Sequence, residues 1–384
     1  EIYPFIEFFS HRFLLVSQNQ IKVMSFLNRQ RIKEEIAQPF VYDKEGRMRV
    51  FDAIRGLSMF LVVFGHVLGC FGLGGYDSFL GSVILTFRMP LFFFISGFFA
   101  YRAVGDWTFK LCRRVLAQKV RAQVLCTLLF FALYDYAFGG NNPLGWIDYG
   151  FGGYWFTIVL FQMFVVYLLL NVISRIIKHT IVNVTMVAIA VLCVYVLIFH
   201  RPDDSNRIWV VLCGENLTKY LQFFVLGIFA RKYFKAFSRL LSNDIFRTAM
   251  VAGFAICMCL WYSDTLKHYD LIYRFIHDIL IRYIGVMMVV SIVFAYKDYF
   301  ENQHFVPQSF RLMGRRSLDI YMMHYFFLPV LPWSMEWLSN NSLISAQMLL
   351  CTLVSIIVVA ICLLLSSVTR TSHFLSVWLW GVRK

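Results

Sequence analysis

Long apolar stretches recur along the whole chain, and they constrain its fold more than any other feature. Ten segments are rich in hydrophobic side chains and carry few charges. An α-helix crosses the hydrocarbon core of a bilayer with about 20 predominantly apolar residues. With 59% hydrophobic and only 15% charged residues, the chain lacks the polar surface that a water-soluble protein of this length needs. We therefore expect an all-α, polytopic membrane helical bundle with about ten transmembrane helices.

The expected spans follow the apolar segments, with edges that the pattern fixes to within a few residues. The sixth is the most polar, because Glu215 and Lys219 interrupt it. The ten are Asp52–Phe71, Phe79–Tyr101, Val120–Phe138, Gly153–Ile173, Ile181–Phe199, Asn216–Ala230, Ile245–Tyr262, Ile272–Tyr296, Leu318–Trp333 and Leu343–Val368.

The basic residues are distributed unequally between the two sides of these spans. Of the 36 Lys and Arg residues, 28 fall on the side that holds both ends of the chain. Cytoplasmic loops carry the excess of Lys and Arg, so both termini are expected in the cytoplasm. The net charge of +14 then reflects topology and contact with the lipid bilayer, and it does not indicate nucleic acid as a partner.

The loops between spans are short, so the sequence predicts one membrane domain without a second soluble domain. We expect residues 1–48 to form a cytoplasmic or interfacial N-terminal arm, residues 49–370 the membrane domain and residues 371–384 a cytoplasmic tail. The nine cysteines are scattered and mostly lie in apolar stretches, without a CxxC pair. They are typical of small core residues, so we expect no metal site.

The first span, "FDAIRGLSMFLVVFGHV", carries three ionisable side chains. Arg55 and His66 are eleven residues apart, which puts them on one helix face about 16 Å apart along the axis. Asp52 lies one turn before Arg55 and can pair with it. One interpretation is an arginine that reaches the interface and a histidine that joins two helices. The other is a histidine that accepts a hydroxyl proton near neutral pH, aligned with a cation that binds an anion.

Two further spans contain polar groups of the same kind. In "ILTFRMPLFFFISGFF", Arg88 precedes Pro90, which removes a helical hydrogen bond, and Ser96 begins a small-residue surface. In "GRRSLDIYMMHYFF", Tyr321 and His324 lie one turn apart. Each stretch alone fits helix packing, whereas a buried arginine beside a proline favours a polar cavity.

These three segments together resemble the integral-membrane acyltransferase family 3, which includes polysaccharide O-acetyltransferases. The first-helix pattern is matched by Asp52, Arg55, Gly56 and His66. The second is matched by "MPLFFFISGF" from Met89 to Phe98. A late pattern, G-x-x-S-L-x-I-Y-x-x-H, runs from Gly314 to His324, and weaker similarities are "YWF" at Tyr154–Phe156 and "FFVLG" at Phe223–Gly227.

The resemblance implies transfer of an acyl group, most often acetyl in that family, from cytoplasmic acyl-CoA to a hydroxyl of a sugar or cell-envelope glycan. It implies His66 as general base, with Arg55 and Asp52 in the catalytic group and Ser96, Tyr321 and His324 lining the cavity. Donor binding would fall to Arg88, Lys110, Arg113 and Arg114, with Arg121 as a further candidate. The family often has an R-x-x-R signature before its third span, and here Lys110 and Arg113 stand at that spacing. Those loop cations are equally explained by the positive-inside rule alone.

Three other functions fit parts of the sequence. A transporter or flippase for a lipid-linked sugar or small solute would also place Arg and His inside the membrane, although paired inverted halves are not evident. An MBOAT-type acyltransferase and a non-catalytic membrane subunit are the other two. For the acyltransferase we expect a multi-pass protein of the inner cell membrane that acts without a metal. A covalent acyl-enzyme and direct transfer are both compatible with the sequence.

Overall fold

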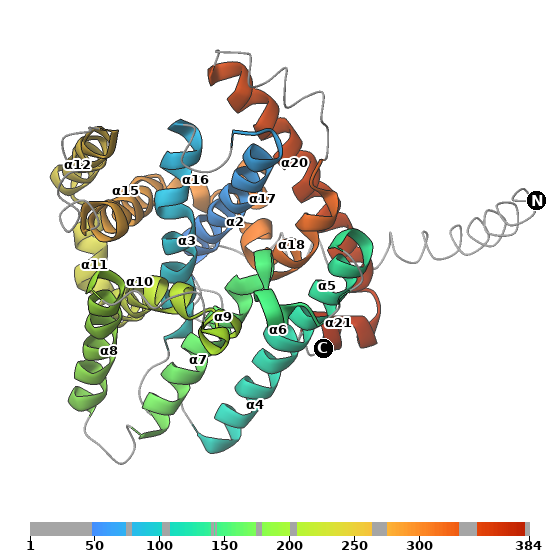
Figure 1. Cartoon of the computed structure of the whole chain (residues 1–384). Coiled ribbons are helices and arrows are strands. Elements are labelled where there is room, and N and C mark those ends of the chain that lie inside the picture. Colours follow the sequence, from blue (N-terminus) through green and yellow to red (C-terminus); the bar gives the residue numbers. More distant parts are fainter. Residues whose placement is uncertain are drawn as a thin grey trace, which may run out of the picture.

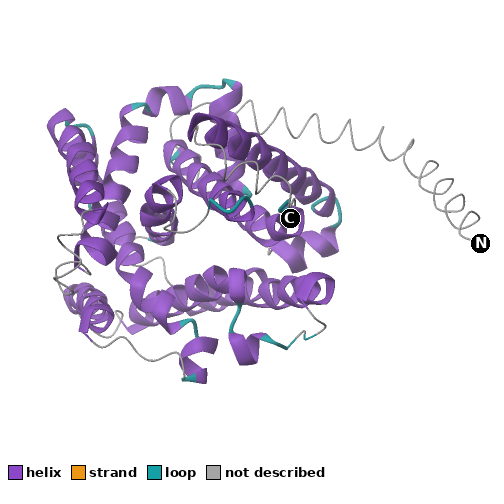
Figure 2. Cartoon of the chain, turned by 45° about the horizontal axis from the view of Figure 1, so that its top comes forward, coloured by secondary structure: helices purple, strands orange, loops and turns teal. Residues whose placement is uncertain are grey.

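The computed structural model describes residues 48–73, 79–101, 108–139, 142, 144–173, 179–199, 206–262, 275–329 and 344–380. Within these ranges the chain forms helices and no strand (Figure 2), which confirms the predicted all-α class. In lipid, a helix satisfies the backbone polar groups within its own segment, so this is the expected form. The predicted N-terminal arm up to residue 47 and residues 381–384 of the predicted tail lie outside the described residues.

The helices are of two kinds, long apolar helices and short connecting ones. Helices α4 and α5 are joined without a break by a π-helical turn, η1. The long elements are α2 (Arg49–Cys70), α3 (Phe79–Ala100), α4 (Phe109–Lys119), η1 (Val120–Leu125), α5 (Cys126–Tyr134), α7 (Trp155–Ile173), α8 (His179–Phe199), α10 (Gly214–Lys232), α12 (Asp244–Tyr262), α15 (Ile281–Ala295) and α20 (Ile344–Thr369). The short ones are η2 (Asp135–Gly139), α6 (Trp146–Tyr149), η3 (Gly152–Tyr154), α9 (Arg207–Val211), α11 (Phe234–Leu241), η4 (Phe275–Leu280), α16 (Lys297–Glu301), α17 (Phe305–Arg315), α18 (Ser317–Met323), η5 (His324–Phe327) and α21 (His373–Trp380).

Seven helical stretches of the described chain are long and apolar enough to cross a membrane, so the chain is a multi-pass membrane protein. The other three predicted spans correspond to elements that are shorter or more polar. Helix α10 carries charges near both ends, α15 has 15 residues, and α18 has seven. Residues 330–333, the end of the predicted ninth span, lie outside the described residues. The number of ten spans and the cytoplasmic location of both termini therefore stay predictions.

Helix α3 lies in the interior of the bundle, where it packs against α2, α10 and α15 (Figure 1). Of its apolar 18-residue window, 78% is buried by protein, compared with 17% for the window in residues 181–199 of α8. Helix α8 can therefore face lipid over most of its surface, whereas α3 contacts mainly other helices. Pro90 lies inside α3, which continues as one helix on both sides of it.

Two glycines let α2 cross α17 at backbone contact. A Cβ atom on Gly56 would overlap the carbonyl oxygen of Phe310, and one on Gly314 would overlap the carbonyl oxygen of Asp52. Small residues allow this approach in membrane helices, because packing replaces the hydrophobic effect as the driving force between them. These glycines belong to two of the motifs noted in the sequence, so the motifs also fix a helix crossing.

A second crossing of the same kind joins α3 to α10. A Cβ atom on Gly97 would overlap the carbonyl oxygen of Phe224, and one on Gly227 would overlap that of Phe94. The segments "ISGF" and "VLG" are therefore complementary surfaces. Together the two crossings fix α2 and α3, which carry the ionisable residues identified in the sequence, relative to α10 and α17.

Candidate active site

His66 lies in the last turns of α2, and its imidazole is half-buried. The Nε2 atom lies 3.0 Å from the hydroxyl oxygen of Tyr325 in η5. The same hydroxyl donates to the carbonyl oxygen of Gly153 in η3, at 3.0 Å. Three segments that are far apart in the sequence thus meet at one half-buried histidine.

His324, one residue before Tyr325, lies beside His66 with 5.3 Å between the ring centroids. Its side chain is fully buried, and its Nδ1 atom lies 2.8 Å from the carbonyl oxygen of Tyr321 and 3.1 Å from that of Ile320. Carbonyl oxygens only accept, so Nδ1 carries the proton and Nε2 carries a lone pair. Among the described residues, that Nε2 atom has no hydrogen-bond partner.

Tyr321 extends this arrangement. Its hydroxyl donates to the carbonyl oxygen of Gly153 at 2.5 Å, and it lies 3.3 Å from the backbone N–H of Phe156, which donates to it. The Gly153 carbonyl oxygen therefore accepts hydrogen bonds from the hydroxyls of both Tyr321 and Tyr325. We call these residues the His66 cluster: His66, Gly153, Tyr321, His324 and Tyr325.

Arg88 approaches the cluster from α3. A Cβ atom on Gly65 would overlap the Arg88 guanidinium, so this cation lies directly against α2 beside His66. It is within electrostatic reach of His66, His324 and Tyr325. The guanidinium fits at this position because Gly65 has no side chain. The structure thus puts Arg88 with the candidate base rather than with the cations of the loops.

A cavity of about 320 Å³ lies at the other end of α2 and α3. We call it the Arg55 cavity, after the arginine of α2 that lines it. Its second cation, Lys119, ends α4 and lies 3.8 Å from the centroid of the Phe164 ring. Arg55 and Lys119 are within electrostatic reach of each other. Two neighbouring cations in a partly enclosed space favour an anionic ligand.

Three buried polar groups also line the Arg55 cavity: the hydroxyls of Ser96 and Ser317 and the side chain of Gln123. Within the described part of the chain, Ser96 Oγ, Ser317 Oγ and Gln123 Oε1 have no hydrogen-bond partner. A buried polar atom without a partner costs free energy, so such atoms are uncommon in folded proteins. A polar ligand or water in the cavity would supply the missing hydrogen bonds.

The Arg55 cavity and the His66 cluster are adjacent but distinct. His66 does not line the cavity, whereas Phe156 does. The backbone N–H of Phe156 donates to Tyr321, which donates to the carbonyl oxygen that also accepts from Tyr325, the partner of His66. A continuous run of hydrogen bonds thus leads from the wall of the cavity to the imidazole.

The structure separates the residues that the sequence grouped as donor-binding. Lys110, Arg113 and Arg114 are exposed on α4 and do not line the Arg55 cavity. Arg121 is half-buried, and its Nε atom donates to the carbonyl oxygen of Ala117. The lining instead includes Val115, Gln118, Lys119 and Ala122 of the same stretch.

Asp52 is buried at the crossing of α2 and α17, where it is within electrostatic reach of Arg311 of α17. It stands at the far end of α2 from His66. Its predicted pairing with Arg55 and its place in the catalytic group stay predictions.

Sequence reasoning missed Tyr325, Gly153, Lys119 and Gln123. Tyr325 directly follows His324 within an aromatic run, and Gly153 directly precedes the "YWF" segment. The sequence therefore held a weak indication that both lie near the site. Lys119 was indistinguishable from the other cations of its loop. Among the described residues there is no group of three or more His, Cys, Asp or Glu side chains that could hold a metal ion.

The fold and this site define a multi-pass membrane protein with a cluster of ionisable side chains between its helices and a cation-lined cavity beside it. A family model described as an acyltransferase domain matches residues 49–367, most of the chain. The protein therefore belongs to acyltransferase family 3, as the resemblance implied. No curated protein matches the chain. The His66 cluster and all residues of the Arg55 cavity except Trp380 fall inside the matched range.

Proposed function

We propose that this acyltransferase moves an acyl group, with acetyl as the first candidate, from cytoplasmic acyl-CoA to a hydroxyl of a sugar or cell-envelope glycan. The single observation that carries the proposal is the neighbouring placement of a half-buried histidine and a cation-lined cavity, joined by hydrogen bonds. An inner cell membrane with both termini in the cytoplasm fits this arrangement, because the basic residues concentrate on the side where the Arg55 cavity lies.

The Arg55 cavity is the proposed site of acyl-CoA. The coenzyme carries several phosphate charges, which Arg55 and Lys119 would attract. Its flexible arm contains amides, whose groups could pair with Ser96, Ser317 and Gln123. Lys110, Arg113 and Arg114 would act only at the outside of the bundle, by raising the local concentration of the anionic coenzyme.

The proposed chemistry takes place at the His66 cluster. The imidazole of His66 accepts the proton of the acceptor hydroxyl, and the oxygen forms a bond to the thioester carbonyl carbon. The carbon–sulfur bond then breaks, the coenzyme leaves as a thiol after taking up that proton, and the acyl ester remains on the acceptor. Arg88, beside His66, is placed to stabilise the negative charge that develops on the carbonyl oxygen.

A transporter of a lipid-linked sugar or small solute is the second candidate, since it too would need polar groups within the bundle. The two functions differ in one consequence: only the enzyme changes the covalent structure of a glycan. The proposal therefore predicts new O-acyl esters in cells that contain the protein.

Mass spectrometry of cell-envelope glycans tests this prediction in cells with the wild-type protein, without it, and with His66→Ala. We expect O-acyl groups with the wild type but neither without the protein nor with His66→Ala, although this variant reaches the membrane in equal amount. His304→Ala is the matched control, because His304 is exposed at the start of α17. Equal O-acyl content with the wild type and without the protein would contradict the proposal.

A further inference from the structure

The last helix of the described chain, α21, lies beyond the range matched by the family model, which ends at residue 367. It folds back against the bundle and packs on η1 and α5. Its last residue, Trp380, is buried and forms part of the wall of the Arg55 cavity. A segment outside the family's common domain thus completes the cavity that the domain begins.

Trp380 is held from two directions. Its indole Nε1 donates to Thr369 Oγ1 at 3.0 Å, and its ring lies 6.1 Å from that of Phe130 in α5. The guanidinium carbon of Arg370 lies 5.9 Å from the centroid of the indole ring. The indole is therefore fixed in place by the end of α20 and by α5.

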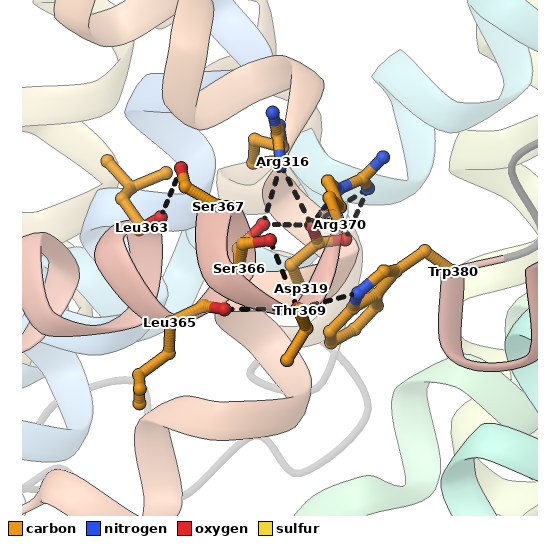
Figure 3. A network of polar contacts seen from close by, with 9 residues as sticks. All are labelled: Arg316, Asp319, Leu363, Leu365, Ser366, Ser367, Thr369, Arg370 and Trp380. Carbon is orange, nitrogen blue, oxygen red and sulfur yellow. Dashed lines mark hydrogen bonds and ion pairs between the residues drawn. The ribbon is translucent and has the colours of Figure 1, made fainter. Parts of the chain in front are cut away.

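Arg370 connects this wall to α18 (Figure 3). Its Nε and Nη2 atoms donate to the two carboxylate oxygens of Asp319 at 2.8 and 2.9 Å. Ser366 donates to the same carboxylate and accepts from Arg316 Nη1 at 2.8 Å. Asp319 is almost completely buried, so it depends on these partners, since a buried charge is costly without them.

Asp319 lies between two functional stretches of α18. Ser317 and Leu318 line the Arg55 cavity, and Tyr321 belongs to the His66 cluster one turn further on. The network of Figure 3 therefore ties α21 to the helix that carries both sites. A rearrangement of Trp380 would change the shape of the cavity without moving His66 itself.

We infer that Trp380 is a donor-contacting residue, and that Asp319 and Arg370 are the positioning residues that hold it against the bound acyl-CoA. This inference rests on the proposed function, because it assigns the Arg55 cavity to that donor. The indole would restrict the volume for the coenzyme arm, and its loss would enlarge the cavity.

The test measures binding of CoA itself to the purified full-length protein by calorimetry. We expect Trp380→Ala to weaken CoA binding about tenfold and Trp380→Phe, which keeps an aromatic wall, by less than about threefold. Trp378→Ala is the matched control, since Trp378 is on the same helix but 49% exposed, and it should stay within about twofold of the wild type.

Hydrogen exchange of the wild-type protein supplies a measurement that does not depend on a variant folding. CoA should slow amide exchange in the peptide that spans residues 370–380. Unchanged exchange there, or equal CoA affinity in Trp380→Ala and wild type, would overturn the inference while leaving donor binding intact. Failure of the wild type to bind CoA would overturn the donor assignment itself, together with this inference.

Discussion

His66 Nε2 and the hydroxyl oxygen of Tyr325 lie 3.0 Å apart, although 259 positions separate the two residues in the sequence. This contact joins the end of α2 to η5, and it completes the run of hydrogen bonds that starts at Phe156 in the wall of the Arg55 cavity. The relationship suggests that Tyr325 orients the imidazole, since a ring nitrogen fixed by a partner determines which nitrogen is left for chemistry.

Replacing Tyr325 with Phe tests this orientation. The variant keeps the ring but removes the hydroxyl from both His66 and Gly153. We expect kcat for acyl transfer to fall about tenfold or more, in keeping with the sensitivity of catalysis to small misplacements, whereas the KM for acyl-CoA stays nearly constant. The free energy of unfolding should fall by only about 1–3 kcal/mol, since two hydrogen bonds are lost and each has a net value of about 0.5–1.5 kcal/mol. Wild-type kcat in this variant would remove the orienting role.

Arg55 and Lys119 are the cations that the structure places at the cavity. Substituting either with Ala should weaken CoA binding about tenfold or more, because a hydrogen bond to a charged group contributes about 1.5–3 kcal/mol. Lys235→Ala, at an exposed position of α11, is the control for net charge. Arg113→Ala should weaken CoA binding less than Lys119→Ala. A larger loss of affinity in Arg113→Ala, measured by calorimetry, would indicate that the exposed cations of α4 form the main donor site.

The crossing of α2 and α17 predicts a large difference between two glycines of the same helix. Gly56→Ala would force a methyl group into the Phe310 carbonyl, and overpacking of this kind costs about 1–3 kcal/mol. Gly69→Ala meets no atom within 4 Å and should be neutral or slightly stabilising, since Ala favours helix over Gly. Thermal unfolding of both variants in the same detergent measures the difference, and equal melting temperatures would argue against the close crossing.

The buried pair of Asp319 and Arg370 should matter more than an exposed pair of the same type. Asp319→Asn leaves Arg370 without its carboxylate, and breaking a buried pair costs about 3–5 kcal/mol. Asp244 pairs with Arg247 on the surface, where the aspartate side chain is 83% exposed, so Asp244→Asn should cost about 1 kcal/mol or less. Comparable losses of stability in the two variants would show that the network in Figure 3 does not fix α21.

The sequence predicted the helices and several members of the site because those features are local. An apolar stretch specifies a membrane helix whatever surrounds it, and the spacing of Arg55 and His66 places them on one face of α2 by helical geometry alone. The motif with Tyr321 and His324 was likewise recognisable within one segment.

The remaining features depend on tertiary contacts. Tyr325 is one aromatic residue among several, and only the approach of Gly153 and α2 gives its hydroxyl a role. Lys119 faces the interior, whereas Arg113 is exposed. The charge pattern of this segment does not distinguish the two residues. From the sequence alone, Arg88 does not differ from any other intramembrane cation. Its contact with Gly65 shows which face of α2 it lies against.

In the proposed mechanism, His66 performs chemistry on a donor bound in the Arg55 cavity. The most direct test compares CoA binding and acyl transfer in purified His66→Ala, with His304→Ala as control and glycan from cells lacking the protein as acceptor. For His66→Ala we predict CoA affinity within about twofold of the wild type and transfer reduced by about 100-fold or more, the usual contribution of a general base. Near-wild-type transfer by His66→Ala would contradict it.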